Sequence, residues 1–582
     1  MTGRWIWARR WRPCADATWR RQPGLPAARC AARQEMERQD MTTGTETCRI
    51  AVIGAGPRAL GALEALIRRD RDAAFRIEIF DPRPWPGAGP NFSPDQSGLC
   101  KLNLPLRSID LGRAPWDGAD FAEGTGGPAA AERFPARAEL GGYLAARLAR
   151  LMARTGIAVT PRRITGIRRR DEAWFLEDGA SRHGPYDEVL LAQGQPATMP
   201  DKQLETWRDH AERHGLDLVA AYPDHRLLRQ AQNWAGKPVG VRGLGLSTLD
   251  VVRLLTLGLG GRFADGRYHR SGREPARILP FSLDGHAPAP KPADATQDAH
   301  FEPTETETRA FRAAVAQAMA EGPDQALAII CDAIHGPVLR ILSDTGGAAD
   351  AGALNAWLSA EREKPGSQED RPAATALRAA IDEAHGRAPP SAGYVTGQLM
   401  RKWQNALRQG FNPNPAAPAT AAAIVGFDDG LKRFSYGPPV ASAQELLILI
   451  QDGLVDPRAA HDPDIVMTGT GWRLVEHDTT AEVAAMVDAV LPPPDLGRLD
   501  DPLMRGLIDS GRVTAIEKGL GARIRPDGRL IGRDGSVQPG LCLLGRLAMG
   551  SVIAADSIHD CFGAAADRWA QGVAARVRDH TG

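Results

Sequence analysis

The chain has 582 residues and carries 71 Lys plus Arg against 71 Asp plus Glu, so its formal net charge is zero. This length is too great for one core and predicts about three or four folding units. The balanced charge gives no net positive field that would attract a polyanion, so we expect neither nucleic acid nor a membrane surface as partner. Seven cysteines without C-x-x-C spacing suit neither a disulfide framework nor a zinc site. We therefore expect a soluble, cytoplasmic protein without a bound metal.

The first forty residues are rich in Arg and Trp and show no clear apolar period. Their arginines would suit a transit peptide, but four acidic residues among them argue against it. A simpler interpretation is that translation begins at Met36 or Met41. In either case we expect residues 1–46 to be a disordered or mis-annotated extension.

A regular pattern begins at Arg49. The short apolar run 50–53 predicts a strand, and it is followed by Gly54-Ala55-Gly56-Pro57-Arg58-Ala59-Leu60-Gly61 and an amphipathic helix. Gly54 would permit a tight turn, and Gly56 would let the backbone approach a pyrophosphate. Gly61 lies one position later than the third glycine of the usual pattern. The helix would offer its N-terminal N–H groups to the phosphates.

Asp81 ends the next predicted strand, 76–80, and completes a β-α-β unit. A carboxylate in this place can accept hydrogen bonds from the ribose hydroxyls of a nucleotide. The alternative is an ordinary turn residue before Pro82. A further apolar strand, 186–192, ends at Gln193-Gly194, on the same expected edge. Strand, glycines, helix and acid occur in the order of a nucleotide-binding unit.

A second glycine turn, Gly243-Leu244-Gly245-Leu246-Ser247, also lies between a predicted strand and a predicted helix. It could seat a second pyrophosphate, and two bound nucleotides would imply electron transfer between them. The alternative is a turn without a ligand. If Asp284 ends the following strand, it would favour NADH over NADPH, although nearby Arg270, Arg273 and Arg277 could reverse this preference.

Several motifs, taken in order, resemble a known family. They include Gly54 to Ala59, Asp81-Pro82, Gly87-Ala88-Gly89, Leu102-Asn103-Leu104-Pro105, Phe134-Pro135-Ala136-Arg137, Gly243 to Ser247 and Gly437-Pro438-Pro439. The series is similar to a family of FAD/NAD(P)-binding proteins that includes an FAD-dependent urate hydroxylase and an aspartate N-monooxygenase. The resemblance covers most of residues 49–290 and 430–582.

The resemblance implies an α/β fold with two dinucleotide-binding, Rossmann-like domains of the FAD/NAD(P)-binding type. The Ala-rich segments between them, broken by Pro, Gly and Asp clusters, indicate a helical insertion. We expect the FAD-binding domain in residues 47–200 and 471–582. The NAD(P)-binding domain is expected in residues 201–290 and 431–470, where a strand runs into Thr468-Gly469. The helical insertion would occupy residues 291–430 and is the most plausible source of specificity, because it is the least family-like part.

The resemblance also implies FAD and either NADH or NADPH as cofactors. The expected cofactor-binding residues are Gly54, Gly56, Pro57, Arg58, Asp81, Gly89, Asn103, Gly194, Gly243, Gly245, Ser247, Gly469 and Gly545. Two departures from the family pattern concern the flavin side. Leu106 follows Pro105 where many relatives have a small residue, and Arg546 follows Gly545 where many flavoproteins place Asp.

The expected activity is that of an FAD-dependent, NAD(P)H-using monooxygenase that hydroxylates a small polar nitrogen-containing metabolite, urate-like or amino-acid-like, with molecular oxygen. A flavin oxidase or reductase without oxygen insertion is one alternative, and a non-catalytic flavin-binding sensor or interaction protein is another. No catalytic side chain is assigned, because oxygen activation belongs to the cofactor. Arg107 and Arg113 could meet an anionic substrate, although surface arginines are the more ordinary interpretation. The sequence leaves the oligomeric state open.

Overall fold

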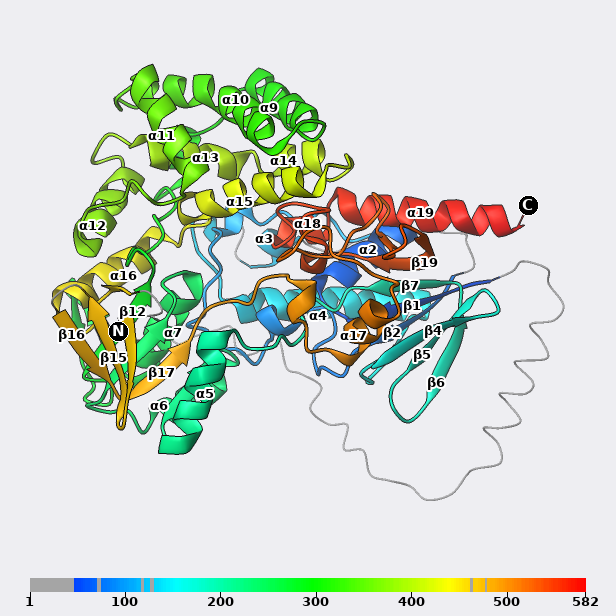
Figure 1. Ribbon diagram of the computed structural model, residues 1–582, viewed down its shortest axis with the longest axis horizontal. Coiled ribbons are helices and arrows are strands. Elements are labelled where there is room, and N and C mark those ends of the chain that lie inside the picture. The colour runs from blue at the N-terminus through cyan, green and yellow to red at the C-terminus, as the bar shows by residue number, and fades with distance from the viewer. Residues whose placement is uncertain are drawn as a thin grey trace. The chain divides into compact units, whose positions relative to one another are not determined.

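The computed structural model describes residues 47–70, 75–116, 120–125, 130–460, 464–476 and 479–581. The expected extension, residues 1–46, lies outside this part of the chain. Residues 48–580 form one compact unit. Figure 1 shows that it contains two sheets with flanking helices and a large block of helices.

The first sheet has six strands in the order β18-β19-β7-β1-β2-β3. All neighbours are parallel except the antiparallel pair β18 and β19. The central strand is fully buried from Ile50 to Ile53, as expected when helices cover both faces of a parallel sheet. The strands are β1 (Cys48–Ile53), β2 (Phe75–Phe80), β3 (Ala158–Thr160), β7 (Glu188–Leu191), β18 (Arg529–Ile531) and β19 (Val537–Leu543).

Helices from both ends of the chain pack with this sheet. They are α2 (Pro57–Arg69), α3 (Phe121–Gly124), α4 (Arg137–Thr155), α17 (Pro502–Asp509), α18 (Ile558–Cys561) and α19 (Ala564–Thr581). A small antiparallel sheet precedes β7 and consists of β4 (Gly166–Arg170), β5 (Ala173–Glu177) and β6 (Arg182–Tyr186). The C-terminal strand and helices thus complete the domain that β1 begins.

The second sheet has five parallel strands in the order β13-β12-β9-β17-β8. They are β8 (Asp217–Ala220), β9 (Pro238–Arg242), β12 (Arg277–Ser282), β13 (Arg458–Ala459) and β17 (Ala485–Asp488), and a short hairpin, β10 (Arg262–Ala264) and β11 (Arg267–His269), precedes β12. The flanking helices are α5 (Lys202–His214), α6 (Asp224–Ala231), α7 (Leu246–Thr256) and α16 (Val440–Gln451).

The expected return to the first domain at residue 471 needs correction. β17 lies between β9 and β8, so the chain stays with the second sheet as far as Asp488. The strand expected to run into Gly469 is β14 (Ile465–Thr468), which pairs antiparallel with β15 (Gly471–Glu476), itself paired with β16 (Thr479–Val483). A three-stranded antiparallel sheet was therefore missed. We propose that the boundary follows Asp488.

Residues 291–435 form the expected helical insertion, drawn in green and yellow in Figure 1. Its helices are α8 (Ala295–Ala299), α9 (Glu305–Ala318), α10 (Pro323–Asp344), α11 (Ala351–Glu363), α12 (Ala373–Ala384), α13 (Ala392–Lys402), α14 (Gln404–Phe411) and α15 (Pro418–Ser435). Within the described residues, α10 alone has the length and hydropathy of a membrane-spanning helix. Its apolar residues pack in the core of the insertion, as those of a central helix do.

The insertion shares its core with the first sheet. One continuous cluster of buried side chains includes Phe80 and Val189 from the sheet and Phe311 and Trp403 from the insertion. The rings of Phe311 and Trp403 stack with centroids 4.3 Å apart. The insertion is therefore packed onto the first domain and is not a tethered module.

Candidate cofactor sites and a partly buried polar cluster

The turn after β1 requires glycine at its first position. Gly54 has φ +98°, and an added Cβ would lie 2.6 Å from the carbonyl oxygen of Ala192. Its N–H donates to the carbonyl oxygen of Phe80 at 2.9 Å. Gly56 then caps α2 with extended backbone, and the nearest atom to an added Cβ is the Cα of Gly89 at 3.9 Å. The space before the helix N-terminus is therefore open, as pyrophosphate binding requires.

Gly61 has a packing role. An added Cβ would overlap the carbonyl oxygen of Cys561 on α18. The absence of a side chain lets α2 approach α18 closely. The contact with α18 explains why the third glycine lies one position later than in the usual pattern. The sequence pattern alone offered no explanation for the offset.

Asp81 lies beside the first glycine turn, as expected, and is 2% exposed. One carboxylate oxygen accepts the N–H of Ala55 at 2.8 Å, and the other accepts the N–H of Arg83 at 2.9 Å. Charged acceptors form strong hydrogen bonds with backbone donors, so Asp81 stabilises the turn itself. Ribose binding by its remaining lone pairs stays a prediction.

Three further expected residues lie around the start of α2. Gly89 has φ +67°, and an added Cβ would be 3.3 Å from the Cδ of Pro57. Gly545 has φ +103°, and its added Cβ would lie 3.5 Å from the Nε of Arg58. The structure thus brings Gly56, Pro57, Gly89 and Gly545 together from three separate segments.

Arg58 is buried and its guanidinium already has protein acceptors. One terminal nitrogen donates to the Asp560 carboxylate and to the Asp560 carbonyl oxygen, both at 2.6 Å, and the other donates to the carbonyl oxygen of Ala555 at 2.8 Å. These bonds join α2 to the C-terminal segment. We now expect Arg58 to hold the glycine turn in place rather than to contact the cofactor.

The second glycine turn repeats the first on its own sheet. Gly243 has φ +103° and donates its N–H to the carbonyl oxygen of Phe281 at 2.8 Å. Gly245 begins α7, and an added Cβ would have no neighbour within 4 Å. Ser247 lies in the first turn of this helix, and the following Thr248 bonds back to the carbonyl oxygen of Gly243 at 2.8 Å. The helix N-terminus is again open to a phosphate.

The arginines that could have bound a 2′-phosphate lie at the wrong end of the second sheet. Arg277 begins β12, and Arg270 and Arg273 precede it. Asp284 follows the end of β12, on the edge where the parallel strand β9 reaches Gly243. Asp284 accepts a hydrogen bond from the Ser282 hydroxyl at 2.6 Å. The three arginines therefore do not lie beside Asp284, and the choice between NADH and NADPH stays open.

One ion pair links the two nucleotide domains. Arg137, the first residue of α4, pairs with Asp250 on α7 and donates to the hydroxyl of Tyr222 at 2.8 Å. Tyr222 in turn donates to Asp250 at 2.5 Å. Burial raises the pKa of Tyr222, so its hydroxyl stays protonated as a donor. The Phe134 to Arg137 motif thus supplies a joint between the domains.

Gly194 and Gly469 have different surroundings. Gly194 follows β7 with φ +73° and open space around an added Cβ. The next residue, Gln195, accepts a hydrogen bond from Arg546 at 3.4 Å, which places Gly194 beside the Gly545 loop. Gly469 lies in the exposed hairpin turn between β14 and β15. It does not follow a parallel strand, so we no longer propose it as a cofactor contact.

Sequence reasoning missed a partly buried polar cluster next to the flavin-side segment. We call it the Tyr436 cluster, and its members are Asn103, Gln404, Asp428, Lys432, Tyr436 and Asp556. Asn103 donates to the carbonyl oxygen of Tyr436 at 3.5 Å. The Tyr436 hydroxyl donates to Gln404 at 3.1 Å and to Asp556 at 3.4 Å. Its position directly before Gly437-Pro438-Pro439 was the one available signal.

The cluster combines positive charge with a carboxyl group that titrates near neutrality. Burial raises the pKa of Asp428 to about 6, and among the described residues Gln404 alone donates a hydrogen bond to it, at 3.3 Å. Lys432 lies 3.0 Å from Asp556 and 2.8 Å from Asp429. Burial acts to lower the pKa of Lys432, but the surrounding carboxylates outweigh it and raise this pKa. Asp428 can therefore accept a proton, whereas Lys432 already has two carboxylate partners.

Comparison with known proteins concerns the first of these nucleotide-binding units. Residues 51–196 match the FAD-NAD(P)-binding family, so this part of the chain is an FAD/NAD(P)-binding domain. The expected resemblance, the α/β fold and the cofactor class are thereby confirmed.

Two curated relatives are nitrosuccinate-forming enzymes by name. The chain is 30% identical over 280 residues to nitrosuccinic acid synthase npaA of Aspergillus oryzae, and the match covers 42% of each chain. It is 28% identical over 581 residues to an L-aspartate N-monooxygenase (nitrosuccinate-forming) of Streptomyces davaonensis, over 81% of this chain and 86% of that one. The FAD-bound structure of DfoA, a cadaverine monooxygenase of Erwinia amylovora, aligns with a TM-score of 0.48 at 12% identity, over 92% of this chain and 94% of that one.

Proposed function

We propose that this protein is an FAD-dependent, NAD(P)H-using monooxygenase that hydroxylates the amino nitrogen of a small acidic amino acid such as L-aspartate. The observation that supports it best is the match to the L-aspartate N-monooxygenase of Streptomyces davaonensis. It covers 81% of this chain, which is more than either nucleotide domain contributes alone. Two open helix N-termini after Gly54 and Gly243 supply a seat for each cofactor.

The chain's own residues have three tasks in this reaction. The bound flavin supplies the oxygen chemistry when it is reduced. Gly54, Gly56 and the start of α2 would hold its phosphates, with the turn stabilised by Asp81. Gly243, Gly245 and α7 would hold the phosphates of the nicotinamide cofactor. The contacts among Arg137, Tyr222 and Asp250 would fix the position of one cofactor site relative to the other.

The substrate is proposed to bind at the Tyr436 cluster, which we call the substrate end of the protein. An amine with a pKa of about 9–10 must lose a proton before its nitrogen can react, and a nearby carboxylate can accept it. Asp428, with a pKa near 6, is mostly ionised at neutral pH and is suited to this task. Arg546, which lies close enough to feel the charge of Asp556, would attract a carboxylate of the substrate. An acidic amino acid fits this mixed lining better than a urate-like anion does, because it carries both charges.

The test starts with the purified full chain. We expect a flavin band near 450 nm that bleaches under anaerobic conditions on addition of NADH or NADPH. On re-oxygenation, L-aspartate should be converted to an N-oxygenated product detectable by mass spectrometry, while urate and succinate should not be. Succinate is the matched control because it lacks only the amino group.

Three outcomes would contradict the proposal in different ways. A protein that cannot be loaded with FAD would exclude every flavin-based function. Flavin that is never reduced by NADH or NADPH would favour the sensor or interaction protein. Reduction followed by stoichiometric peroxide, with no oxygenated product from any amino acid, would favour the oxidase or reductase.

A further inference from the structure

A cavity lies outside the two proposed nucleotide sites. It has a volume of about 330 Å³ and is formed by α13 and α14 of the insertion together with α18 and the start of α19. Four cationic side chains line it, Arg401, Lys402, Arg408 and Arg568, against the single carboxylate of Asp560. None of the expected cofactor residues, all of which lie in the described part of the chain, contributes to its lining.

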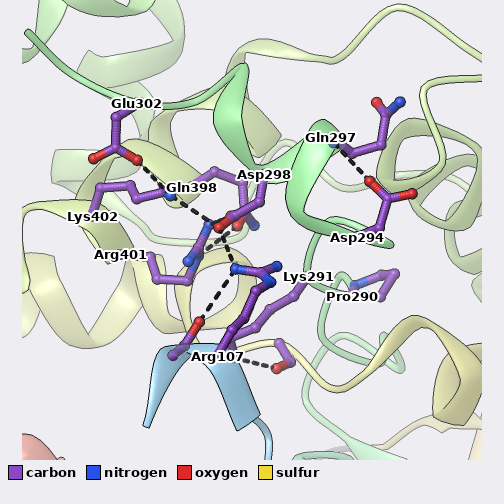
Figure 2. A network of polar contacts seen from close by, with 12 residues as sticks. Arg107, Pro290, Lys291, Asp294, Gln297, Asp298, Glu302, Gln398, Arg401 and Lys402 are labelled. Atoms are coloured by element: carbon purple, nitrogen blue, oxygen red, sulfur yellow. Dashed lines mark hydrogen bonds and ion pairs between the residues drawn. The ribbon is translucent and has the colours of Figure 1, made fainter. Parts of the chain in front are cut away.

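The acidic partners of these cations lie mainly behind the cavity wall. Arg401 and Lys402 share Asp298, which also receives Arg107 at 3.1 Å, and Lys402 pairs with Glu302 at 2.6 Å as well, as Figure 2 shows. Asp560 is bonded to Arg58 at 2.6 Å on the side of α2. Asp298 and Asp560 are thus each matched by cations, and the cavity retains an excess of positive charge.

Arg408 provides an independent sign of a missing ligand. It is 9% exposed, its Nε donates to the carbonyl oxygen of Ala554 at 3.1 Å, and the same nitrogen lies 3.6 Å from the Asp560 carboxylate. One of its terminal nitrogens, Nη2, is buried without a hydrogen-bond partner among the described residues. Leaving a charged donor buried and unpaired is costly, so such an atom usually has an acceptor in the functional state.

The start of α19 adds further donors. Gly563, Ala564 and Ala565 line the cavity at the N-terminus of this 18-residue helix. The first N–H groups of a helix have no partner within it, and this end carries a partial positive charge. Guanidinium groups and a helix N-terminus together favour carboxylate or phosphate oxygens.

We propose that this cavity binds a small ligand through carboxylate or phosphate groups, at a site separate from both nucleotide seats. Its volume lies at the lower end of the range for small-molecule pockets, about 300–1,000 Å³, and suits a compact metabolite. The ligand would bridge the insertion to the C-terminal segment that anchors Arg58. Gln404, which lines the cavity and belongs to the Tyr436 cluster, would connect the ligand to the proposed substrate end.

The test is calorimetric titration of the full-length protein, saturated with FAD, with inorganic phosphate and, separately, with succinate at constant ionic strength. We expect saturable binding of at least one probe. Arg408→Gln and Arg568→Gln should each weaken it about tenfold or more, because each removes a charged donor. Arg309→Gln is the matched control, since Arg309 is an exposed arginine on α9 that pairs with Glu305. Its affinity should equal that of the wild type.

The two probes show whether the ligand binds through phosphate groups or through carboxylate groups. Binding of phosphate alone indicates a phosphorylated ligand, and binding of succinate alone indicates a carboxylic acid. The proposal is overturned if neither probe gives a saturable signal, or if Arg408→Gln and Arg568→Gln bind as tightly as Arg309→Gln. Should Arg408→Gln fail to fold, Arg568→Gln and Lys402→Gln carry the test. No turnover is measured, so a failure of the proposed hydroxylation leaves this result intact.

Discussion

Gly56 and Gly61 stand at the two ends of the first turn of α2, and a methyl group added at each would meet different surroundings. At Gly56 no atom would be closer than 3.9 Å, so the glycine keeps space open before the helix. At Gly61 the methyl group would overlap the backbone of Cys561. We propose that the first glycine serves ligand binding, whereas the second allows close helix packing, although both belong to one sequence motif.

We predict that Gly56→Ala and Gly61→Ala separate these roles. Gly56→Ala should leave the melting temperature of the flavin-free protein unchanged but lower the FAD content per protein. Gly61→Ala should destabilise the fold by about 1–3 kcal/mol or more, because backbone must move to accommodate it. Gly142→Ala, where nothing lies within 4 Å on α4, is the control for a harmless helix substitution. Equal melting temperatures for the Gly61→Ala and Gly142→Ala proteins would refute the packing role.

The raised pKa of Asp428 predicts that the free energy of unfolding depends on pH. Its folded pKa of about 6 lies above the ordinary value of 3.8, so the folded state binds its proton more tightly than the unfolded state does. The resulting stability is present below about pH 4 and is lost as pH rises through 6. Asp428→Asn avoids this loss. Relative to the wild type, its free energy of unfolding should therefore rise by up to about 3 kcal/mol between pH 4 and pH 7.

Urea unfolding at pH 4.5 and 7.5 measures this difference. Asp298→Asn is the opposing control, because Arg401 and Lys402 hold the pKa of Asp298 down to about 2 against the effect of its burial. That carboxylate contributes stability above about pH 4 and loses it only as pH falls toward 2. Asp298→Asn should therefore be destabilised equally at both pH values. A pH-independent effect of Asp428→Asn would show that its carboxyl is not buried as described.

At the scale of elements, the two β-turn-α units have the same construction on separate sheets. Each glycine turn begins with a positive φ, at Gly54 and Gly243, and each helix begins at an unobstructed glycine, Gly56 and Gly245. Both turns lie at the carboxyl ends of parallel strands, where such sheets bind ligands. The sequence predicted both units, because their signals are local and lie within a few residues of each other.

We predict that Gly245→Ala impairs the nicotinamide cofactor alone. Its backbone is extended and no atom lies within 4 Å of an added Cβ, so the substitution should not alter folding. The methyl group would occupy the path of the pyrophosphate and raise the apparent KM for NAD(P)H about tenfold. FAD content should stay unchanged. Gly322→Ala is matched to it, because Gly322 also caps a helix with extended backbone and open space. An unchanged KM in stopped-flow reduction would count against the second seat.

At the scale of the whole molecule, the insertion and the first domain share one core. Phe80 and Val189 of the sheet belong to the same buried cluster as Phe311 and Trp403 of the insertion. Elements that share a core tend to unfold together. We therefore expect flavin release and loss of helical structure to occur in one thermal transition.

Trp403→Ala tests this coupling. Trp403 is fully buried, stacks on Phe311 and donates to the Thr308 hydroxyl at 3.0 Å, so its removal should cost about 3–5 kcal/mol. Flavin fluorescence and circular dichroism should shift to lower temperature together. Leu283→Ala, at a 71% exposed position, should shift neither. If Trp403→Ala lowers the helical transition but leaves flavin release in place, the insertion is an independent unit.

The sequence by itself determined the local units, and tertiary structure decided what surrounds them. The glycine turns, Asp81 and the helical insertion could be predicted because turn chemistry and apolar periodicity are properties of neighbouring residues. The place of β17 in the second sheet, the acceptors of Arg58 and the Tyr436 cluster could not. Each depends on residues far apart in the chain, such as Arg58 with Asp560 and Asn103 with Tyr436, which only packing brings within hydrogen-bond distance.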